Sequence, residues 1–252
     1  MRSGNDNRNG TPLRVAMVHY RDAAESGGSL RVGETIANHL DPHQVATDMV
    51  FAYGGPGIIA KHCRVPCHYL DARGPTDCRA WLRARALFRG LRPDIVHFQD
   101  AVVWLRAALL STSYRKLVHV HGRYEKNSAS ITGRTHPFRA THLFHAYLKL
   151  TDTQVFISTT AMKSLLELGW VASERSFVVY NAIDQTRLEL TADKSEARLK
   201  LGLPRDAKLL GMVCRLVREK FLNCIQKTES ENCRGWLTGS CTCWAMISRL
   251  VL

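Results

Sequence analysis

The chain has 252 residues, of which 45% are hydrophobic and 23% charged, with a formal net charge of +13 at pH 7. This composition excludes an intrinsically disordered chain, and no apolar run reaches the roughly 18 residues of a membrane-spanning helix. The excess of Lys and Arg favours anionic partners such as nucleotide phosphates or acidic lipid headgroups. Nucleic acid is not expected as a partner, because zinc-finger spacings, aromatic RNA-binding signatures and basic heptads are missing from the sequence.

Residues 1–12 are polar and are expected to form a disordered leader. The start of the sequence lacks the apolar core of a secretory signal, so we expect a cytoplasmic protein. The eight cysteines are expected to be reduced, non-ligating thiols, because the chain is neither small nor visibly secreted. The spacings Cys63-x3-Cys67 and Cys241-x-Cys243 make no convincing half of a zinc site, and no metal is expected.

Apolar, β-branched runs alternate with helical patterns along most of the chain. Strands are expected over 14–20, 44–53, 94–100, 116–122, 153–159 and 176–184. Helices are expected over 29–40, 77–91, 102–110, 138–150, 160–168 and 194–201. Ser29 is the expected N-cap of the first helix, which follows a loop containing Gly27 and Gly28. This alternation predicts right-handed β-α-β crossovers and a mostly parallel sheet, so the fold class is α/β.

Polar side chains gather where these strands end. They are Asp22, Glu25, Gln99, Asp100, His119, His121, Ser158, Thr159, Asn181 and Asp184. In a parallel sheet the ligand lies beyond the carboxyl ends of the strands, where the strand order reverses. The sequence therefore predicts a binding site at this edge.

The expected domain organisation has three parts after the leader. Residues 13–190 form the first domain, and 191–220 are a linker with the first strand of a second domain. Residues 221–252 hold four of the eight cysteines and two of the five tryptophans without a clear helical or strand period. We expect this segment to be an aberrant or non-native tail, the alternative being a short natural C-terminal segment.

Several segments carry a family resemblance in their order and spacing. They read RVAMVHY…SGGSLRVGETIANHL, RPDIVHFQD, KLVHVHG, VFISTTAMKSLLELG, VVYNAID and GMVCRLVREKF. From Arg14 to Lys220 the chain resembles the retaining GT-B glycosyltransferases typified by bacterial family 4 (group 1) hexosyl- and mannosyltransferases. The resemblance implies a Rossmann-like parallel sheet with helices on both faces, as the N-terminal, acceptor-side domain, followed by a truncated donor-side domain.

The resemblance also implies the reaction: a hexose passes from a nucleoside-diphosphate sugar to a glycan or lipid-linked acceptor, with retention and no further cofactor. Transfer leaves negative charge on the departing diphosphate, which the catalyst must neutralise. Gly27 and Gly28 precede a helix whose N–H groups suit a phosphate, although an ordinary tight turn is the alternative. Arg215 and Lys220 resemble the basic pair that grips the diphosphate, the alternative being two solvated charges. Cys214 and Phe221 stand where the family has glycines.

His121, at a strand end before Gly122, is the expected catalytic-side residue, since in the family this histidine contacts the transferred sugar. The alternative is a structural histidine, as expected for His97 and His119. Glu125, Ser158, Asn181 and Asp184 are expected polar groups of the cleft. Ser158 is equally well a helix N-cap, and the last two match the interdomain signature of the family.

RAWLRARALFRGLR (79–92) places five arginines around apolar residues. It reads either as a solvated helix face over the sheet or as a contact with an anionic membrane, peripheral at its inner face. The paired glutamates of the family's donor domain have no counterpart after Lys220, so donor selectivity and most donor affinity are expected to be missing and the transferase activity of this truncated chain is expected to be impaired. The transferase therefore has an alternative, a non-catalytic Rossmann-like fragment acting as a binding module. A dinucleotide oxidoreductase is disfavoured, because no G-x-G-x-x-G follows the first strand.

Overall fold

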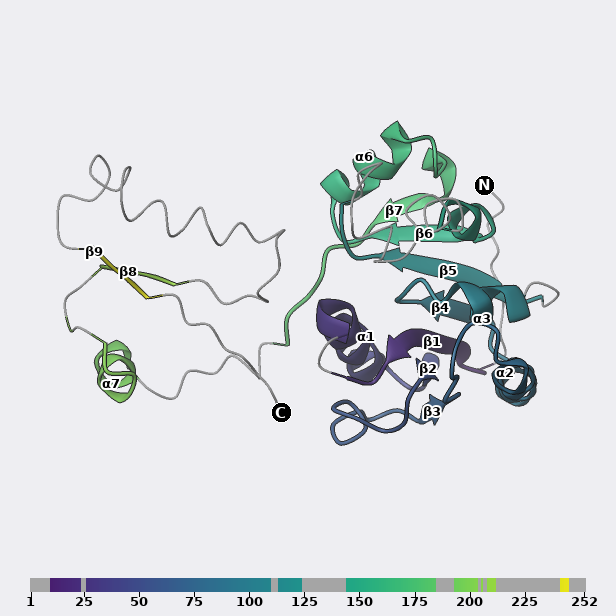
Figure 1. Ribbon diagram of the computed structural model, residues 1–252, viewed down its shortest axis with the longest axis horizontal. Coiled ribbons are helices and arrows are strands. Elements are labelled where there is room, and N and C mark those ends of the chain that lie inside the picture. The colour runs from purple at the N-terminus through teal and green to yellow at the C-terminus, as the bar shows by residue number, and fades with distance from the viewer. Residues whose placement is uncertain are drawn as a thin grey trace. The chain divides into compact units, whose positions relative to one another are not determined.

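The computed structural model describes residues 10–23, 26–109, 113–123, 144–184, 193–203, 205, 208–211 and 241–244. The chain divides into two units, Met1–Asp184 and Gln185–Leu252. Figure 1 labels their helices and strands.

In the described part of the first unit, seven strands form one sheet of order β3-β2-β1-β4-β5-β6-β7. The strands are β1 (Leu13–Arg21), β2 (Val45–Tyr53), β3 (Cys67–Tyr69), β4 (Ile95–Phe98), β5 (Arg115–Val120), β6 (Thr153–Phe156) and β7 (Ser176–Val178). Every neighbouring pair is parallel. The predicted α/β class with a parallel sheet is confirmed.

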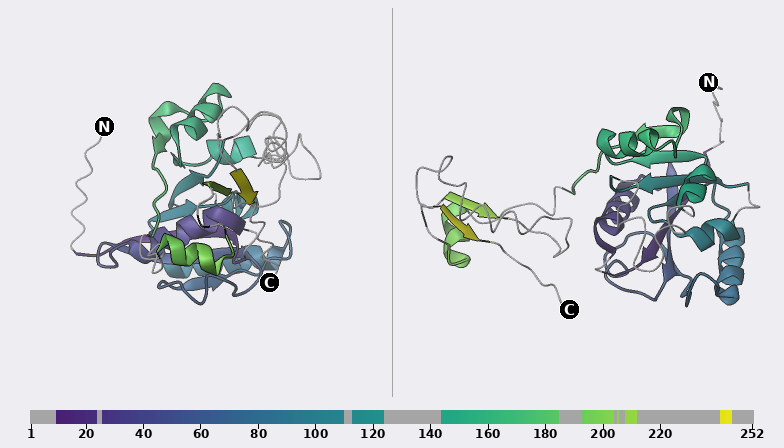
Figure 2. Two further views of the ribbon diagram at one scale, coloured as in Figure 1. Left: turned by 90° about the vertical axis from the view of Figure 1, so that its left-hand side faces the viewer. Right: turned by 45° about the horizontal axis from the view of Figure 1, so that its top comes forward.

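Helices cover both faces of this sheet, as expected (Figures 1 and 2). The described helices of the first unit are α1 (Gly27–His39), α2 (Cys78–Leu91), α3 (Val103–Ala108), α6 (Thr159–Glu167) and the 3-10 turn η2 (Ser173–Arg175), and residues 144–149 are also helical. Because side chains alternate along a strand, β1 sends Val15 and Met17 into the core under α1, and Ala16 and Val18 into the opposite core.

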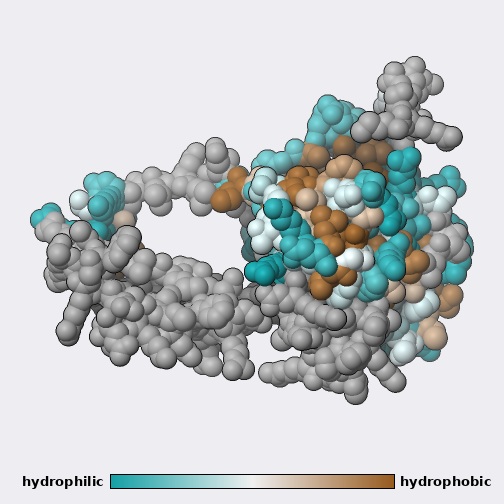
Figure 3. Space-filling view, turned by 90° about the horizontal axis from the view of Figure 1, so that it is seen from above, coloured by the Kyte–Doolittle hydropathy of each residue, from teal (hydrophilic) through white to brown (hydrophobic). Residues whose placement is uncertain are grey.

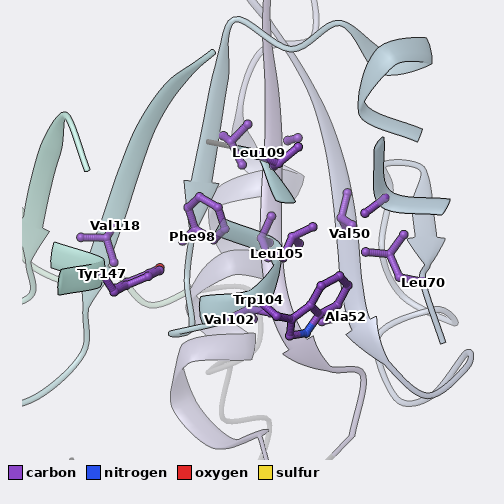
Figure 4. Close-up of a cluster of buried hydrophobic side chains, with 14 of the residues drawn as sticks. Val50, Ala52, Leu70, Phe98, Val102, Trp104, Leu105, Leu109, Val118 and Tyr147 are labelled. Atoms are coloured by element: carbon purple, nitrogen blue, oxygen red, sulfur yellow. The ribbon is translucent and has the colours of Figure 1, made fainter. Parts of the chain in front are cut away.

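The larger core lies beneath α2, α3 and α6, and Figure 4 shows part of it. Trp104 and Leu105 of α3 pack there with residues of several strands, among them Val50, Phe98 and Val118. Strands buried on both faces read as continuous apolar runs, which is why the sequence predicted them well.

Four local expectations need correction. The N-cap of α1 is Ser26, so Ser29 lies inside the first turn of the helix. The three-residue strand β3, the turn η2 and the strand β9 were not expected. Elements of three or four residues are too short to show a period of their own. The helix expected over 77–91 is present as α2, and Asp77 is its N-cap, accepting hydrogen bonds from the N–H groups of Arg79 and Ala80.

The second unit contains α7 (Lys194–Lys200) and the parallel pair of β8 (Lys208–Gly211) with β9 (Cys241–Trp244). Asp193 caps α7, its carboxylate accepting from the Glu196 N–H at 2.8 Å. The strand β9 falls within residues 221–252, where the sequence shows no period. The expectation that this segment is non-native stays a prediction.

The first unit exposes apolar side chains in β7 and in the extended segment after it. They are Phe177, Val179, Tyr180 and Ile183. Figure 3 looks down on the top of Figure 1 and shows apolar residues exposed among hydrophilic ones. Of the helices that the structure describes, none combines the length and apolar character required to cross a membrane.

Candidate functional site

The strand order reverses between β1 and β4. From β1 the chain moves outward through α1 to β2 and β3, and α2 then returns it to β4 on the other side of β1. The connections that follow β1 and β4 therefore leave in opposite directions. This divergence opens the crevice in which doubly wound sheets bind ligands, so the carboxyl ends of β1, β4 and β5 define the candidate site.

The loop from β1 enters α1 through the predicted glycines. Gly27 has a φ of 70°, a left-handed conformation that costs a side-chain-bearing residue about 1 kcal/mol or more. A Cβ added to Gly28 would meet nothing within 4 Å, so no described neighbour requires glycine there. Within the described residues, Ser26 makes no side-chain cap and the first turn holds no acidic residue. The helix start can therefore receive an anion.

Asp100, which follows β4, connects that strand to β1 and α1. Its carboxylate accepts from the Tyr20 N–H of β1 and from the Ser29 hydroxyl of α1, both at 2.9 Å. Burial works to raise the pKa of Asp100, but the nearby His19 and these two donors outweigh it and hold the pKa below its ordinary value. Asp100 is thus an ionised group that fixes the first turn of α1 against β1 and β4.

His19 lies at the end of β1 and is completely buried. Its Nδ1 is 3.7 Å from Asp100 Oδ2, and among the described residues neither ring nitrogen has a hydrogen-bond partner. A Cβ on Gly33 would come within 2.4 Å of the His19 ring. Glycine is therefore required at position 33 for α1 to approach the strand that carries His19.

The Gln99 side chain lies within hydrogen-bonding distance of two histidines, His97 and His121. Its Nε2 lies 3.2 Å from His97 Nε2, and its Oε1 lies 2.8 Å from His121 Nε2. In this orientation the Gln99 oxygen accepts a proton held on His121 Nε2, which leaves a lone pair on His121 Nδ1. His121 can then accept a hydrogen bond from a hydroxyl group.

Three histidine rings stack along β4 and β5. The ring centroids of His97 and His119 are 5.5 Å apart, and those of His119 and His121 are 4.3 Å apart. Burial is the main cause that lowers the pKa of His97 and His119 to about 3 and that of His121 to about 4. All three rings are consequently neutral near pH 7.

A second buried carboxylate, Asp22, follows β1 and has a different environment. It accepts from the N–H groups of Gly57 (2.8 Å), Ile59 (2.7 Å) and Ala60 (3.2 Å), and from the Tyr69 hydroxyl (3.0 Å). These donors occupy both of its oxygens. Asp22 therefore anchors the loop between β2 and β3 and has no share in the crevice.

The other predicted site residues are placed as follows. Ser158 is the N-cap of α6, its hydroxyl accepting from the Ala161 N–H at 3.1 Å, which confirms the capping alternative. Asn181 is exposed in the extended segment after β7. Asp184 Oδ1 lies 3.9 Å from His39 Nε2, at the C-terminal end of α1. Ala182, at the glycine position of the family signature, has no positive φ. The cleft roles of Ser158, Asn181 and Asp184 stay predictions.

Glu125, Arg215 and Lys220 lie outside the described residues, so their expected roles also stay predictions. In the described part of the chain, no group of three or more His, Cys, Asp or Glu side chains could hold a metal ion.

Sequence reasoning missed His19 and did not single out Gln99 and Asp100 within the polar set. A signal was present: the first strand ends in His-Tyr before a glycine loop, much as the fifth ends in His-Val-His-Gly. Partners such as Ser29 and Asp100 are 71 positions apart, and no local pattern connects them.

The Rossmann-like parallel sheet, with its crevice at the β1–β4 reversal, is the architecture of a GT-B glycosyltransferase. Residues 26–187, more than half of the chain, match the profile of Glycosyltransferase Family 4, and the chain belongs to that family. No curated protein sequence matches it.

Solved structures agree on the fold. Anabaena HepE in complex with UDP and glucose has a TM-score of 0.63 at 17% identity over 86% of this chain and 57% of that chain. A glycosyltransferase from Rickettsia africae ESF-5 has a TM-score of 0.60 at 18% identity over 82% and 54%. Sucrose-phosphate synthase from Thermosynechococcus elongatus has a TM-score of 0.62 at 14% identity, over 82% of this chain and 57% of that chain. The chain thus spans little more than half the length of these proteins.

Proposed function

We propose that the chain transfers a hexose from a nucleoside-diphosphate sugar to a glycan or lipid-linked acceptor, with retention of the anomeric configuration. The observation that carries the proposal is the linked set of groups at the strand reversal. His121 contacts Gln99, and the adjoining Asp100 holds Ser29 in the first turn of α1. These contacts support the proposal that one crevice holds both the sugar-contacting group and the phosphate-binding helix start.

The proposed division of labour follows the charges of the reaction. The leaving diphosphate gains negative charge, and the N–H groups at the start of α1 meet it without cost of reorganisation. His121, neutral and protonated on Nε2, accepts a hydrogen bond from a sugar hydroxyl through Nδ1. Arg215 and Lys220 supply the remaining positive charge in this proposal, so it involves no metal or further cofactor. HepE, the structural neighbour that binds UDP and glucose, supports this donor class.

The transfer activity is tested with two glycine variants. A Cβ at Gly28 and a Cβ at Gly74 both face open space, so neither Gly28→Ala nor Gly74→Ala should destabilise the fold. We expect Gly28→Ala to lower the rate of nucleoside diphosphate release from UDP-glucose or a related donor at least tenfold. Gly74→Ala should keep the parent rate.

A second variant separates transfer from binding. His121→Ala should reduce turnover while binding of the nucleoside diphosphate is retained. If the full chain binds the nucleotide but neither hydrolyses nor transfers any sugar, the alternative of a non-catalytic binding module is correct. Turnover that is identical in the parent, Gly28→Ala and His121→Ala proteins would refute this site.

The acceptor side of the proposal includes contact with a membrane surface. The outer face of α2 exposes Arg79, Arg85 and Arg89 around Leu82, whose side chain is 69% exposed. The helix contains no acidic residue. An apolar side chain framed by cations is suited to the interface of an anionic bilayer, which a lipid-linked acceptor would require.

Sedimentation with vesicles tests this contact. The parent protein should bind vesicles containing phosphatidylglycerol and not neutral ones, and the binding should weaken with salt. The double variant Arg85→Glu, Arg89→Glu should lose binding. The control double variant Lys61→Glu, Lys163→Glu changes the net charge by the same amount at exposed positions outside α2. It should keep its binding to the vesicles. Equal losses in both variants would show that net charge alone is responsible.

A further inference from the structure

Two cysteine thiols, those of Cys63 and Cys67, lie beside Met49 of β2. Cys63 lies in the loop between β2 and β3, and Cys67 is the first residue of β3. Cys67 pairs in register with Met49, and Cys63 Sγ lies 3.3 Å from Met49 Sδ. Both cysteines are half-buried, carry free thiols and pack against the core beneath α1. The proposed transfer reaction uses neither of them.

Both cysteines lie beside Met49, and the acidities of their thiols diverge. The Cys67 thiol donates to the Val65 carbonyl, with Sγ 3.6 Å from the oxygen, and its interaction with Cys63 is the main cause that lowers the pKa of Cys63 to about 7, against the opposing effect of burial. The same interaction is the main cause that raises the pKa of Cys67, with burial adding to it. The nearby carboxylates of Asp22 and Glu34 oppose ionisation at Cys63 without reversing it. Cys63 is therefore a thiolate in part at neutral pH, beside a protonated partner.

The backbone holds this pair in place. The Cys63 N–H donates to the Ile59 carbonyl at 2.9 Å, and the N–H groups of Ile59 and Ala60 donate to Asp22. The Arg64 N–H donates to Asn38 Oδ1 at 2.8 Å, and the Pro66 carbonyl accepts from the Met49 N–H at 2.8 Å. Both ends of the short segment are thus fixed, which holds Cys63 and Cys67 beside Met49.

We propose that Cys63 and Cys67 form an oxidation site that a hydroperoxide converts into a disulfide. The Cys63 thiolate attacks one peroxide oxygen, the O–O bond breaks, and the departing hydroxide takes up a proton to leave as water. Cys63 is then a sulfenic acid. The Cys67 thiol attacks its sulfur, the S–O bond breaks, and a second water leaves as the S–S bond forms. Two thiols are oxidised by two electrons while one peroxide is reduced to two waters.

The sequence provides a direct readout. Trypsin cleaves after Lys61, Arg64 and Arg73, so Cys63 and Cys67 fall in separate peptides, 62–64 and 65–73. The full-length protein is treated with hydrogen peroxide at pH 7, alkylated and digested. We expect the two peptides to appear as one cross-linked species, two hydrogens lighter than their sum, that dithiothreitol separates.

Serine variants test whether Cys63 and Cys67 are the two cysteines that form the cross-link. Cys63→Ser and Cys67→Ser should each lose the cross-linked species, and in Cys67→Ser the sulfenic acid at Cys63 should be trapped by dimedone. Cys78→Ser, at an exposed cysteine on α2, should keep the cross-link at the parent level. Circular dichroism verifies that each variant is folded. Full alkylation of Cys63 after peroxide treatment, or cross-linking of Cys63 to other cysteines as often as to Cys67, would overturn the proposal.

Discussion

Two carboxylates, the buried Asp22 and the half-buried Asp100, follow strands of the same sheet and differ in how fully they and their neighbours are paired. Asp22 receives four hydrogen bonds from one loop and from Tyr69. Asp100 receives two, from different elements, and its neighbour His19 has no hydrogen-bond partner at either ring nitrogen among the described residues. Because buried polar groups are normally paired, the His19 ring beside Asp100, unpaired within the described part of the chain, supports the ligand site proposed there.

The largest expected difference between the two regions is their response to acid. His97, His119 and His121 belong to the Asp100 region, with pKa values of about 3, 3 and 4 in the folded chain, against about 6.5 in an unfolded chain. Below pH 6.5 the unfolded state therefore binds more protons, and the free energy of unfolding falls as the pH drops towards 4. Each histidine contributes about 1.4 kcal/mol per pH unit in the middle of this window.

Urea unfolding at pH 7, 6, 5 and 4 measures this dependence, with His119→Gln as the comparison. The variant should lose about a third of the slope, since one of three titrating rings is gone. An unchanged slope would mean that the histidine stack is not the source of the acid sensitivity.

Removing each carboxylate in turn tests the comparison itself. Asp22→Ala leaves three backbone N–H groups without their acceptor and should lower the free energy of unfolding by about 3 kcal/mol or more. Asp100→Ala leaves one backbone N–H and one hydroxyl without their acceptor and should lower the free energy of unfolding by about 1–2 kcal/mol. Chemical denaturation measures both. Equal losses would remove the distinction between the two sites.

The packing of α1 on His19 gives a smaller effect. Gly33→Ala places a Cβ against a buried ring that has little room to move, and overpacking should destabilise the protein by about 1–3 kcal/mol. Gly90→Ala, at an exposed position of α2 with open space around it, should stabilise it by about 0.5–1 kcal/mol. Thermal unfolding of the pair separates crowding from helix propensity, and stabilisation by both would refute the close approach.

The smallest expected effect concerns the bond from Ser29 to Asp100. Ser29→Ala removes this hydroxyl donor and should cost about 1 kcal/mol while reducing donor turnover, because the first turn of α1 loses its tie to β4. Ser26→Ala removes a hydroxyl that donates to the Arg21 carbonyl at 2.7 Å and provides the control. A larger loss of turnover in Ser26→Ala would contradict the role given to Asp100.

The sequence predicted the layers of the fold better than the contacts of the site. Runs such as DIVHFQD and KLVHVHG gave β4 and β5 with their polar carboxyl ends, because apolar strands and strand-end residues are local patterns. Ser29 was predicted to be the N-cap because it precedes the apolar residues of the helix. The helix begins earlier, at Gly27, and the Ser29 hydroxyl donates a hydrogen bond to Asp100. The strand-end position of His19 and the spacing of Cys63 and Cys67 are visible in the sequence, but their packing against Gly33 and Met49 is tertiary and has no local pattern.

The central claim is that the crevice around Asp100 binds the diphosphate of a sugar nucleotide while the Asp22 loop does not. Amide resonances followed during a titration of the full chain with UDP test this most directly. We predict that the signals of Gly27, Gly28 and Ser29 and of the His121 ring shift together with one dissociation constant, while those of Gly57 and Ile59 stay in place. Shifts confined to Gly57 and Ile59, or none at millimolar UDP, would contradict the account.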